Sequence, residues 1–393
     1  MAISAVVGQA RNFDAREAGT QASLRAVEHL GRNPVVLGFI FASHNLPLQQ
    51  VLSGAAALLG DAPLVGFSTS AELTSQGQQQ HSVVVALLTG SDITARADWF
   101  PGFGEDSRST SQKMAHSLQL YQAYGTLFVV ADGFHGDTKD LCAALPRGDY
   151  TLAGCLSGGE LRQARTYQVG GRQSGFGGLA AALLAGKVAS GIGLAHGWNE
   201  VGAYYKITRT RGAWVRTLNN QPAAETYASL FGYEAREWAY PPLNEMVRLY
   251  PLGIEQGKDK PLLVRSPLRM EADGSLRMHT SIPEGSIAHM LVGSMDACQK
   301  AAEKAAMQAL KSLGKARPVL AVVLPDIAWQ MLGETKPGRE IEAVRSVIGP
   351  EVPIVGGYTL GQIAHSVGTG KKASSPELFN QNIEVVLIGE PSD

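Results

Sequence analysis

The chain has 393 residues, of which 45% are hydrophobic and 18% are charged, and its formal net charge at pH 7 is −1. This composition is typical of a soluble globular protein with a large core and excludes a disordered chain. A net charge near zero gives no general attraction to nucleic acid or anionic lipid, so we expect neither a nucleic-acid nor a membrane partner. The N-terminus lacks a signal-peptide pattern and the cysteines lack zinc-site spacing, so we expect a cytoplasmic protein without a bound metal.

The predicted helices and strands follow one another in the same order three times. In the first 90 residues we expect helices at 14–30 and 48–59 and strands at 35–41 and 83–88. Between about 91 and 187 we expect helices at 106–121 and 139–145 and strands at 126–130 and 179–184. The third series has helices at 296–313 and 339–348 and strands at 319–323 and 383–388. Short β-rich runs separated by turn residues occupy residues 191–286.

A ten-residue segment also occurs three times, before the last strand of each series. The copies are residues 64–73 (LVGFSTSAEL), 152–161 (LAGCLSGGEL) and 354–363 (IVGGYTLGQI), and we name them the repeat phrases. Each has an apolar opening pair, glycine third, a hydroxyl residue sixth and Glu or Gln ninth. The repetition predicts an α/β protein of two domains, built from repeated β-α-β-α-β-β units with a β-rich insert between the second and third units.

The polar residues of the repeat phrases are candidate ligand contacts. They follow strands of an α/β sheet, and the carboxyl ends of such strands are where these folds usually bind ligands. Hydroxyl groups suit a ligand carboxylate, and carboxylates suit a ligand ammonium. The candidates are Ser68, Thr69, Ser157 and Thr359 for the first role and Glu72 and Glu160 for the second. The alternative is that these side chains cap turns or tie one repeat to the next.

Arg265 and two histidines are further candidates. Arg265 follows a strand-like run and could hold a carboxylate through two hydrogen bonds, although a structural ion pair is the commoner role for such an arginine. His196 and His44 each follow an apolar strand. Either histidine could contact the ligand or ligate haem iron, and the alternative is a partly buried histidine with only structural hydrogen bonds.

Short motifs along nearly the whole chain resemble those of the FIST proteins. The first part of the resemblance is carried by Phe41-Ala42-Ser43-His44, GFSTSAE at 66–72, Ala131-Asp132-Gly133, Arg165-Thr166-Tyr167, His196-Gly197-Trp198 and Gln221-Pro222-Ala223. The second part is carried by Tyr250-Pro251-Leu252-Gly253, Val264-Arg265, Asp273-Gly274-Ser275, Ile282-Pro283-Glu284-Gly285, residues 356–363 and Asn380-Gln381. The resemblance implies a FIST N-like domain at 1–230 and a FIST C-like domain at 231–393.

The FIST resemblance implies a sensory module of signal transduction that binds a small, amino-acid-like ligand. We expect such a module to act on a separate output partner, such as a histidine kinase, and to need no cofactor. One branch of the family resembles haem-binding nitric-oxide sensors, so haem held by His44 or His196 is the alternative. A second alternative is a hydrolase using a serine of the first phrase or Cys155. We expect no enzyme, because the first phrase lacks the closing glycine of a nucleophile elbow and Cys155 has no identifiable base.

Overall fold

The computed structural model describes residues 2–31, 33–159, 161–162, 164–258, 260–333, 337–365 and 375–392. Contacts divide the chain into two compact units. Unit 1 comprises Met1–His196, Gln299–Leu378 and Asn382–Asp393, and unit 2 comprises Gly197–Cys298 and Phe379–Gln381. Unit 1 therefore holds the three repeats and unit 2 the β-rich segment. The division into a FIST N-like region at 1–230 and a FIST C-like region at 231–393 stays a prediction.

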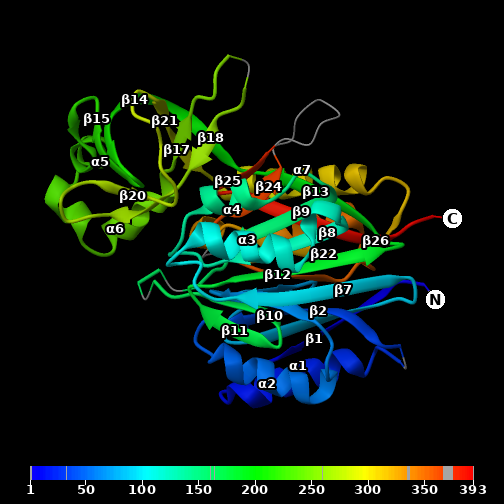
Figure 1. Ribbon diagram of the computed structural model, residues 1–393. Helices are drawn as coiled ribbons and strands as arrows, with labels where there is room; N and C mark the ends of the chain where they lie inside the picture. The colour runs from blue at the N-terminus through cyan, green and yellow to red at the C-terminus, as the bar shows by residue number, and fades with distance from the viewer. Residues whose placement is uncertain are drawn as a thin grey trace. The chain divides into compact units, whose positions relative to one another are not determined.

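Unit 1 contains the same series of elements three times (Figure 1). The first series is β1 (Ser4–Ala10), α1 (Ala15–Val27), β2 (Val35–Ser43), α2 (Leu48–Leu59), β3 (Leu64–Thr69), β4 (Glu72–Thr74), β5 (Gly77–Gln79) and β6 (Val83–Thr89). The second is β7 (Ile93–Phe100), α3 (Ser107–Ser117), η1 (Leu120–Gln122), β8 (Tyr124–Ala131), α4 (Thr138–Ala144), β9 (Asp149–Leu156), β10 (Tyr167–Gly171), β11 (Gln173–Phe176) and β12 (Leu179–Gly186). The third is β13 (Ala189–Ala195), α7 (Met295–Leu313), β22 (Arg317–Pro325), α8 (Ile327–Leu332), α9 (Arg339–Ile348), β23 (Ile354–Gly357), β24 (Gln362–His365), β25 (Pro376–Phe379) and β26 (Ile383–Glu390).

The α/β fold class and its repeats are confirmed. Each repeat also contains a strand pair that the sequence pattern did not reveal. These pairs are β4–β5, β10–β11 and β24–β25. Most of residues 74–81, a glutamine-rich stretch, belong to the first of these hairpins. Hydrophobic periodicity does not reveal the β4–β5 hairpin, because its two strands have only 3 residues each.

The three hairpins are exchanged cyclically among three six-stranded sheets. The sheet of the first repeat, β1-β6-β2-β3, continues with β10-β11 from the second repeat. The sheet of the second repeat, β7-β12-β8-β9, continues with β24-β25 from the third. The sheet of the third repeat, β13-β26-β22-β23, continues with β4-β5 from the first. Each repeat therefore completes the sheet of another repeat.

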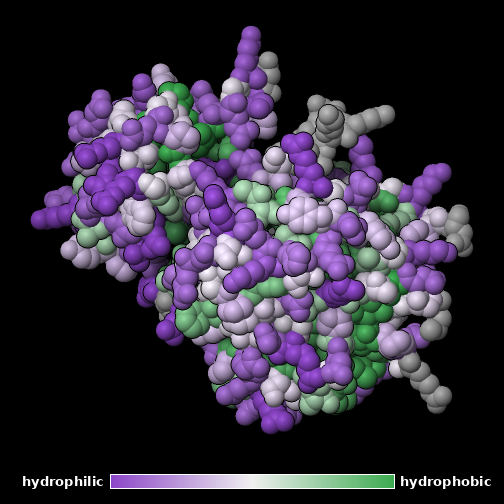
Figure 2. All heavy atoms as spheres, in the orientation of Figure 1, coloured by the Kyte–Doolittle hydropathy of each residue, from purple (hydrophilic) through white to green (hydrophobic). Residues whose placement is uncertain are grey.

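The inner faces of the three sheets share one hydrophobic core. It contains residues from all three repeats, and the rings of Phe39 and Phe128 meet edge to face in it with centroids 5.0 Å apart. Helices cover the outer faces, as Figure 1 shows for α1 and α2 beside β1 and β2. These two helices pack backbone to backbone, because a Cβ on Gly54 would lie 2.0 Å from the carbonyl oxygen of Arg16. The surface over them is mainly hydrophilic in Figure 2.

Asp14 begins α1, because its side chain accepts a hydrogen bond from the amide of Glu17 at 2.8 Å. Asp14 is therefore the N-cap of α1, and it satisfies one of the free amides of the first turn. Among the described residues, no helix combines the length and the apolar character that crossing a membrane requires.

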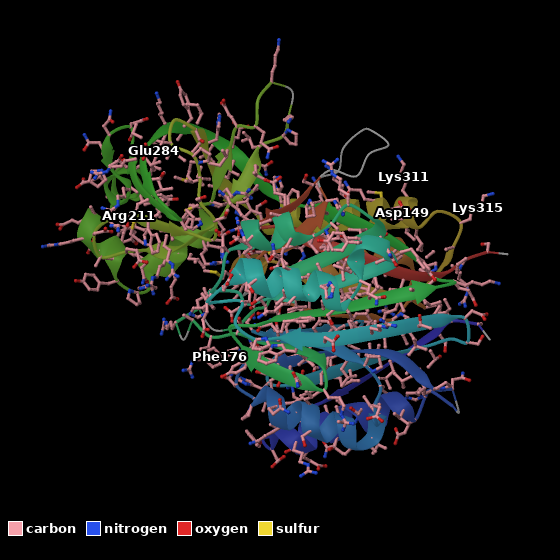
Figure 3. The ribbon with its side chains drawn as sticks, viewed as in Figure 1. Asp149, Phe176, Arg211, Glu284, Lys311 and Lys315 are labelled. Atoms are coloured by element: carbon pink, nitrogen blue, oxygen red, sulfur yellow. The ribbon has the colours of Figure 1, made fainter. Side chains whose placement is uncertain are left out.

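Unit 2 is a separate β-rich body with its own core. Its elements are β14 (Trp198–Arg211), β15 (Trp214–Leu218), β16 (Gln221–Pro222), α5 (Ala223–Phe231), η2 (Ala235–Ala239), α6 (Leu243–Met246), η3 (Val247–Leu249), β17 (Leu252–Ile254), β18 (Leu263–Arg265), β19 (Pro267–Met270), β20 (Leu276–Met278) and β21 (Ile287–Gly293). The sheet order is β18-β17-β21-β14-β15-β20-β19, with β16 beside β15. Tyr227 and Trp238 lie in its core, and Glu284, labelled in Figure 3, accepts a hydrogen bond from the amide of Thr210 at 2.7 Å.

Candidate functional site

The repeat phrases are the points where the chain crosses from one sheet to another. The first phrase comprises β3 and the start of β4, which belong to different sheets. The third phrase leads from β23 to β24 in the same way. In the second phrase the chain leaves β9 at Leu156 and reaches β10 only at Tyr167, so the crossing is longer.

The third-position glycines allow strands to approach closely beside these crossings. A Cβ on Gly66 would lie 1.7 Å from the carbonyl oxygen of Ile40, and one on Gly356 would lie 1.8 Å from that of Val323. Such distances leave no room for any side chain. The glycine that the three phrases share is therefore required by packing.

Ser68 and Thr69 link the first phrase to the other two. The hydroxyl of Ser68 donates to the carbonyl oxygen of Gly158, at 2.9 Å. The hydroxyl of Thr69 lies 3.0 Å from the carbonyl oxygen of Tyr358, to which it can donate. Both side chains are buried. The phrases thus converge through hydrogen bonds that tie one repeat to another.

Ser157 and Thr359 hold their phrases to the neighbouring parallel strand. The hydroxyl of Ser157 lies 2.9 Å from the carbonyl oxygen of Ala131 at the end of β8. The hydroxyl of Thr359 donates to the carbonyl oxygen of Pro325 at the end of β22, at 3.1 Å. Both hydroxyls therefore tie neighbouring strands together, which is the structural role that was the alternative to ligand contact.

In the structure, three residues hold equivalent places at the ends of the crossings, namely Glu72, Gln168 and Gln362. Each of these residues pairs with the fourth residue of another phrase. The pairs are Glu72 with Gly357, Gln168 with Phe67, and Gln362 with Cys155. Glu160, which the ungapped alignment puts at this position, lies outside the described residues. The ungapped alignment did not identify Gln168, because the long second crossing shifts it eight residues beyond the aligned position.

Gln168 and Gln362 make matching hydrogen bonds. The side-chain amide of Gln168 donates to the hydroxyl of Ser157 at 2.8 Å, and that of Gln362 donates to the hydroxyl of Thr359 at 2.9 Å. The carbonyl oxygen of the Gln168 side chain also accepts from the amide of Gly178, at 3.1 Å. Two of the three equivalent positions therefore place an amide donor on the sixth-position hydroxyl.

Glu72 takes the third of these positions as a buried carboxyl group. Its Oε2 accepts hydrogen bonds from the amide of Ser82 at 2.9 Å and from its hydroxyl at 2.7 Å. Among the described residues, its Oε1 has no hydrogen-bond partner. Burial raises the pKa of Glu72 to about 8, although the bonds from Ser82 and the charge of Arg11 oppose the shift. At neutral pH the group is therefore mainly an uncharged acid.

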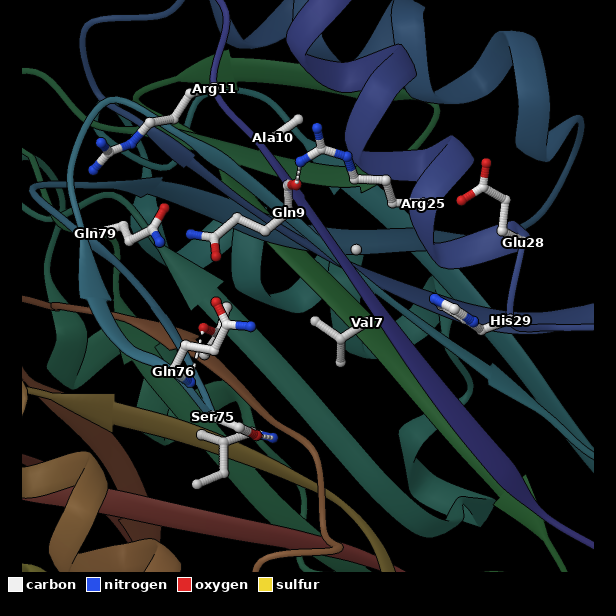
Figure 4. A pocket seen from close by; sticks show the side chains of 13 residues that line it. Val7, Gln9, Ala10, Arg11, Arg25, Glu28, His29, Ser75, Gln76 and Gln79 are labelled. Carbon is white, nitrogen blue, oxygen red and sulfur yellow. Dashed lines mark hydrogen bonds between the residues drawn. The ribbon is translucent and has the colours of Figure 1, made fainter.

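A hollow of about 570 Å³ in unit 1 lies beside the strand that carries Glu72 (Figure 4). Thr74, two residues further along β4, is part of its wall. Its other walls come from the end of β1, the C-terminal end of α1 and the turn between β4 and β5. The charged side chains that surround it are Arg11, Arg25 and Glu28, and His29 lies next to them.

A chain of hydrogen bonds connects this hollow to Glu72. The side-chain amide of Gln9, which faces the hollow, donates to the hydroxyl of Ser82 at 3.1 Å. That hydroxyl donates in turn to Glu72. Arg25 donates to the carbonyl oxygen of Gln9, as Figure 4 shows. Neither arginine was singled out from the sequence, because an exposed arginine on a helix or after a strand carries no pattern of its own.

The remaining sequence candidates lie in different parts of the chain. His44 is half-buried, and its Nδ1 is 3.2 Å from the carbonyl oxygen of Thr69. His196 is half-buried directly after β13. Arg265 is a buried residue of unit 2. Burial lowers the pKa of His279 most, and the charges of Arg248, Arg277 and Arg265 lower it further, in decreasing order.

Asp132 is a buried polar residue within one of the short motifs of the sequence. Its Oδ1 accepts hydrogen bonds from the amides of Phe134 at 2.9 Å and His135 at 2.8 Å. Its Oδ2 accepts from the hydroxyl of Thr166 at 3.1 Å and the amide of Gly177 at 3.0 Å. It thereby joins the end of β8 to the hairpin β10–β11. The motif Ala131-Asp132-Gly133 is thus explained by a structural role.

The fold and the site define an α/β repeat protein whose repeats exchange three hairpins. Buried polar side chains of the repeat phrases lie at the crossings, and a hollow of small-molecule size lies beside them. The FIST N domain matches residues 36–221 and the FIST C domain matches residues 223–365, so the chain belongs to the FIST family. FIST domains are sensory domains of signal transduction that bind small ligands. Among proteins with curated functions, none matches the chain.

Three solved structures are distantly similar to the chain. A cyanuric acid hydrolase aligns over 100% of both chains with 8% identity and a TM-score of 0.39. PurLQS from Thermotoga maritima aligns over 99% of this chain and 73% of its own with 10% identity and a TM-score of 0.23. T. maritima PurL complexed with ATP aligns over 98% and 71% with 10% identity and a TM-score of 0.24. Scores this low carry no argument about function.

Proposed function

We propose that this FIST protein is a sensor that binds an amino-acid-like ligand and acts on a separate output partner, such as a histidine kinase. The observation that supports the ligand class is the hollow beside β4, which has both signs of charge around it. Its volume of about 570 Å³ falls in the range of small-molecule sites, about 300 to 1,000 Å³. It would hold a single amino acid together with ordered water.

The charged groups suit the two ends of such a ligand. Arg25 already donates to the carbonyl oxygen of Gln9, which fixes its position, and its guanidinium has further N–H groups for a carboxylate. Arg11 provides a second guanidinium, and Glu28 can accept from an ammonium group. Four hydroxyl groups of the repeat phrases are engaged with backbone carbonyls, so we assign them to holding the crossings together and not to ligand contact; they belong to Ser68, Thr69, Ser157 and Thr359.

The two alternatives draw less support. The hydroxyl of Ser68 is committed to the carbonyl oxygen of Gly158 and is buried, which opposes a nucleophilic role. Cys155 is buried in the apolar core, where burial and the nearby Glu384 raise the pKa of its thiol and keep it protonated. The haem alternative depends on His44 or His196, and we propose that no cofactor is resident. A stoichiometric Soret band on adding haemin, lost in His44→Ala or His196→Ala, would restore that alternative.

Thermal-shift screening against the amino acids and small dicarboxylates at pH 7 tests the proposed function. A ligand present at about 100 times its Kd stabilises the native state by about 2.7 kcal/mol, which is easily measured as a rise in Tm. Calorimetry then compares Arg25→Met with Arg16→Met, an exposed arginine of the same helix. We expect at least about tenfold weaker binding for Arg25→Met and unchanged binding for Arg16→Met. If both variants bind a validated ligand like wild type, the ligand is not in this hollow.

A further inference from the structure

The hollow beside β4 lies where a contact between two sheets is missing. In the second repeat the corresponding contact is made, because β10 packs directly against β7. A Cβ on Gly170 would lie 2.1 Å from the carbonyl oxygen of Asp98. A Cβ on Gly171 would lie 2.7 Å from that of Ala97. Two glycines in succession therefore allow the hairpin β10–β11 to cover the edge of β7.

Thr74 and Ser75 hold the places of these two glycines in the hairpin β4–β5. Thr74 pairs with the second residue of the third phrase, Val355, just as Gly170 pairs with the second residue of the first phrase. Thr74 and Ser75 line the hollow together with residues 7–10 of β1, which is the counterpart of β7. Because both positions carry side chains, β4 does not approach β1 as β10 approaches β7. The edge of β1 is therefore open where that of β7 is covered.

The main chain of β1 presents hydrogen-bonding groups to this hollow (Figure 4). β1 is the edge strand of its sheet, and β6 is its neighbour. Directly before β1, the amide of Ile3 donates to Glu390 at 3.0 Å, and further along the carbonyl oxygen of Gln9 accepts from Arg25, so both residues face away from β6. Every second residue of an antiparallel strand directs its amide and its carbonyl group to the same side. Val7 and the amide of Gln9 therefore also face away from β6, and no hydrogen bond to a described residue occupies them there.

We propose that the ligand of this hollow is a short peptide in extended conformation, which adds a strand to the open edge of β1 and places its C-terminal carboxylate at Arg11 and Arg25. The inference rests on the proposed function, because it names the class of ligand in the same hollow. In parallel pairing, one ligand residue donates its N–H to the carbonyl oxygen of Val7 and presents its own carbonyl end to the amide of Gln9. When that residue is the last of the peptide, its carboxylate lies at Gln9, whose carbonyl oxygen accepts from Arg25. A dipeptide uses the volume that a single amino acid would leave to ordered water.

The charges around the hollow agree with a peptide that has free ends. Arg11 and Arg25 suit a terminal carboxylate, and Glu28 suits a terminal ammonium group. The open edge of β1 recognises a main chain and not a particular side chain, since its own groups belong to the main chain. A peptide bond brings the N–H that the carbonyl oxygen of Val7 accepts. A small dicarboxylate brings no such donor and would leave that carbonyl group without a partner.

Thermal-shift screening of the dipeptides Ala-X and X-Ala beside the free amino acids tests the ligand class. We expect calorimetry to give at least about tenfold tighter binding for the best dipeptide than for either of its amino acids. Methylating the peptide nitrogen of that dipeptide removes the N–H for Val7 and should weaken binding at least about tenfold. A free amino acid that binds as tightly as its dipeptides, or a methylated dipeptide that binds unchanged, overturns the inference and leaves the proposed function standing. If neither amino acids nor dipeptides bind, both are overturned.

Gln9→Pro tests the same contact from the side of the protein. Proline removes the amide that faces away from β6, and an edge strand tolerates proline at such a position. Gln9→Ala is the matched control, because it keeps the amide and loses the same side chain, with its hydrogen bond to Ser82. We expect the dipeptide to bind at least about tenfold more weakly to Gln9→Pro than to Gln9→Ala, and equal binding overturns the inference. Should Gln9→Pro not fold, the comparison of the dipeptide with its methylated analogue decides.

Discussion

Gln168 on β10 donates to the hydroxyl of Ser157 at 2.8 Å, and this hydrogen bond joins two sheets. Gln168 lies in the sheet of the first repeat, because β10 pairs with β3, whereas Ser157 follows β9 in the sheet of the second. The same side chain also accepts from the amide of Gly178, directly before β12. One buried amide therefore fixes the position of an exchanged hairpin with respect to its own repeat.

Removing that amide should destabilise unit 1 strongly. In Gln168→Leu the amide of Gly178 loses its buried acceptor and the hydroxyl of Ser157 loses a donor, and each unsatisfied buried group costs about 1 to 3 kcal/mol. We expect a loss of about 2 to 4 kcal/mol in the free energy of unfolding, measured by urea denaturation. Gln76→Leu, an exposed glutamine of the β4–β5 turn, is the matched control and should change stability by less than about 0.5 kcal/mol. A loss for Gln168→Leu as small as that of the control would show that the amide is dispensable.

The order of elements was predictable because each repeat has long apolar strands and amphipathic helices. The helices at 48–59 and 339–348 were placed at the bounds that α2 and α9 have. The exchange of hairpins was not predictable, since β4, β5 and β24 have only 3 or 4 residues each. Their partners lie in another repeat, and hydrophobic periodicity carries no information about such distant pairing.

The sequence indicated which hydroxyl residues lie at the crossings, whereas their role as ligand contacts stays a prediction. Ser68, Thr69, Ser157 and Thr359 do converge, but they bind backbone carbonyls. Sequence alone could not separate ligand contact from repeat-to-repeat contact, because hydroxyl groups serve both equally well. The hollow was missed, since its arginines lie on α1 and after β1, far from any repeat phrase.

The raised pKa of Glu72 makes the free energy of unfolding depend on pH. In the folded protein Glu72 holds its proton up to about pH 8, and in the unfolded chain it loses it near 4.5. Between these values the native state binds one more proton than the unfolded state. The contribution of Glu72 to stability is therefore fully present below pH 4.5 and is lost as pH rises to about 8. The loss is at most about 1.4 kcal/mol per pH unit. The difference in unfolding free energy between Glu72→Gln and wild type should therefore increase with pH across this window and then level off. A constant difference would show that Glu72 ionises normally.

Gly66→Ala tests whether close approach explains the third-position glycine. The added Cβ would lie 1.7 Å from the carbonyl oxygen of Ile40, so β2 and β3 would have to separate. We expect a loss of about 3 kcal/mol or more, or insoluble protein. Gly31→Ala has open space around its Cβ but a φ of +68°, and should cost only about 1 to 2 kcal/mol. Equal Tm values for the two variants would contradict the packing explanation.

Thiol labelling tests the burial of Cys155. Cys155 and Cys298 are buried, whereas Cys142 is half-buried. We expect a thiol reagent at pH 8 to modify Cys142 in the native protein and to reach Cys155 only after denaturation, because the buried thiol is held protonated. Cys142→Ser should then show almost no fast labelling. Rapid labelling of Cys155, located by peptide mass, would revive it as a candidate nucleophile.

Glutamine substitutions at Glu72 and Glu28 separate a structural from a ligand-binding role for Glu72. A neutral acid cannot pair with a ligand ammonium, and Oε2 is occupied by Ser82. We therefore expect Glu72→Gln to bind a validated amino-acid ligand within about twofold of wild type at pH 7, whereas Glu28→Gln, which removes the carboxylate at the hollow, should bind at least about tenfold more weakly. Isothermal titration calorimetry measures both. If instead Glu72→Gln abolishes binding and Glu28→Gln does not, the ammonium lies at the repeat phrases and the hollow beside β4 is not the site.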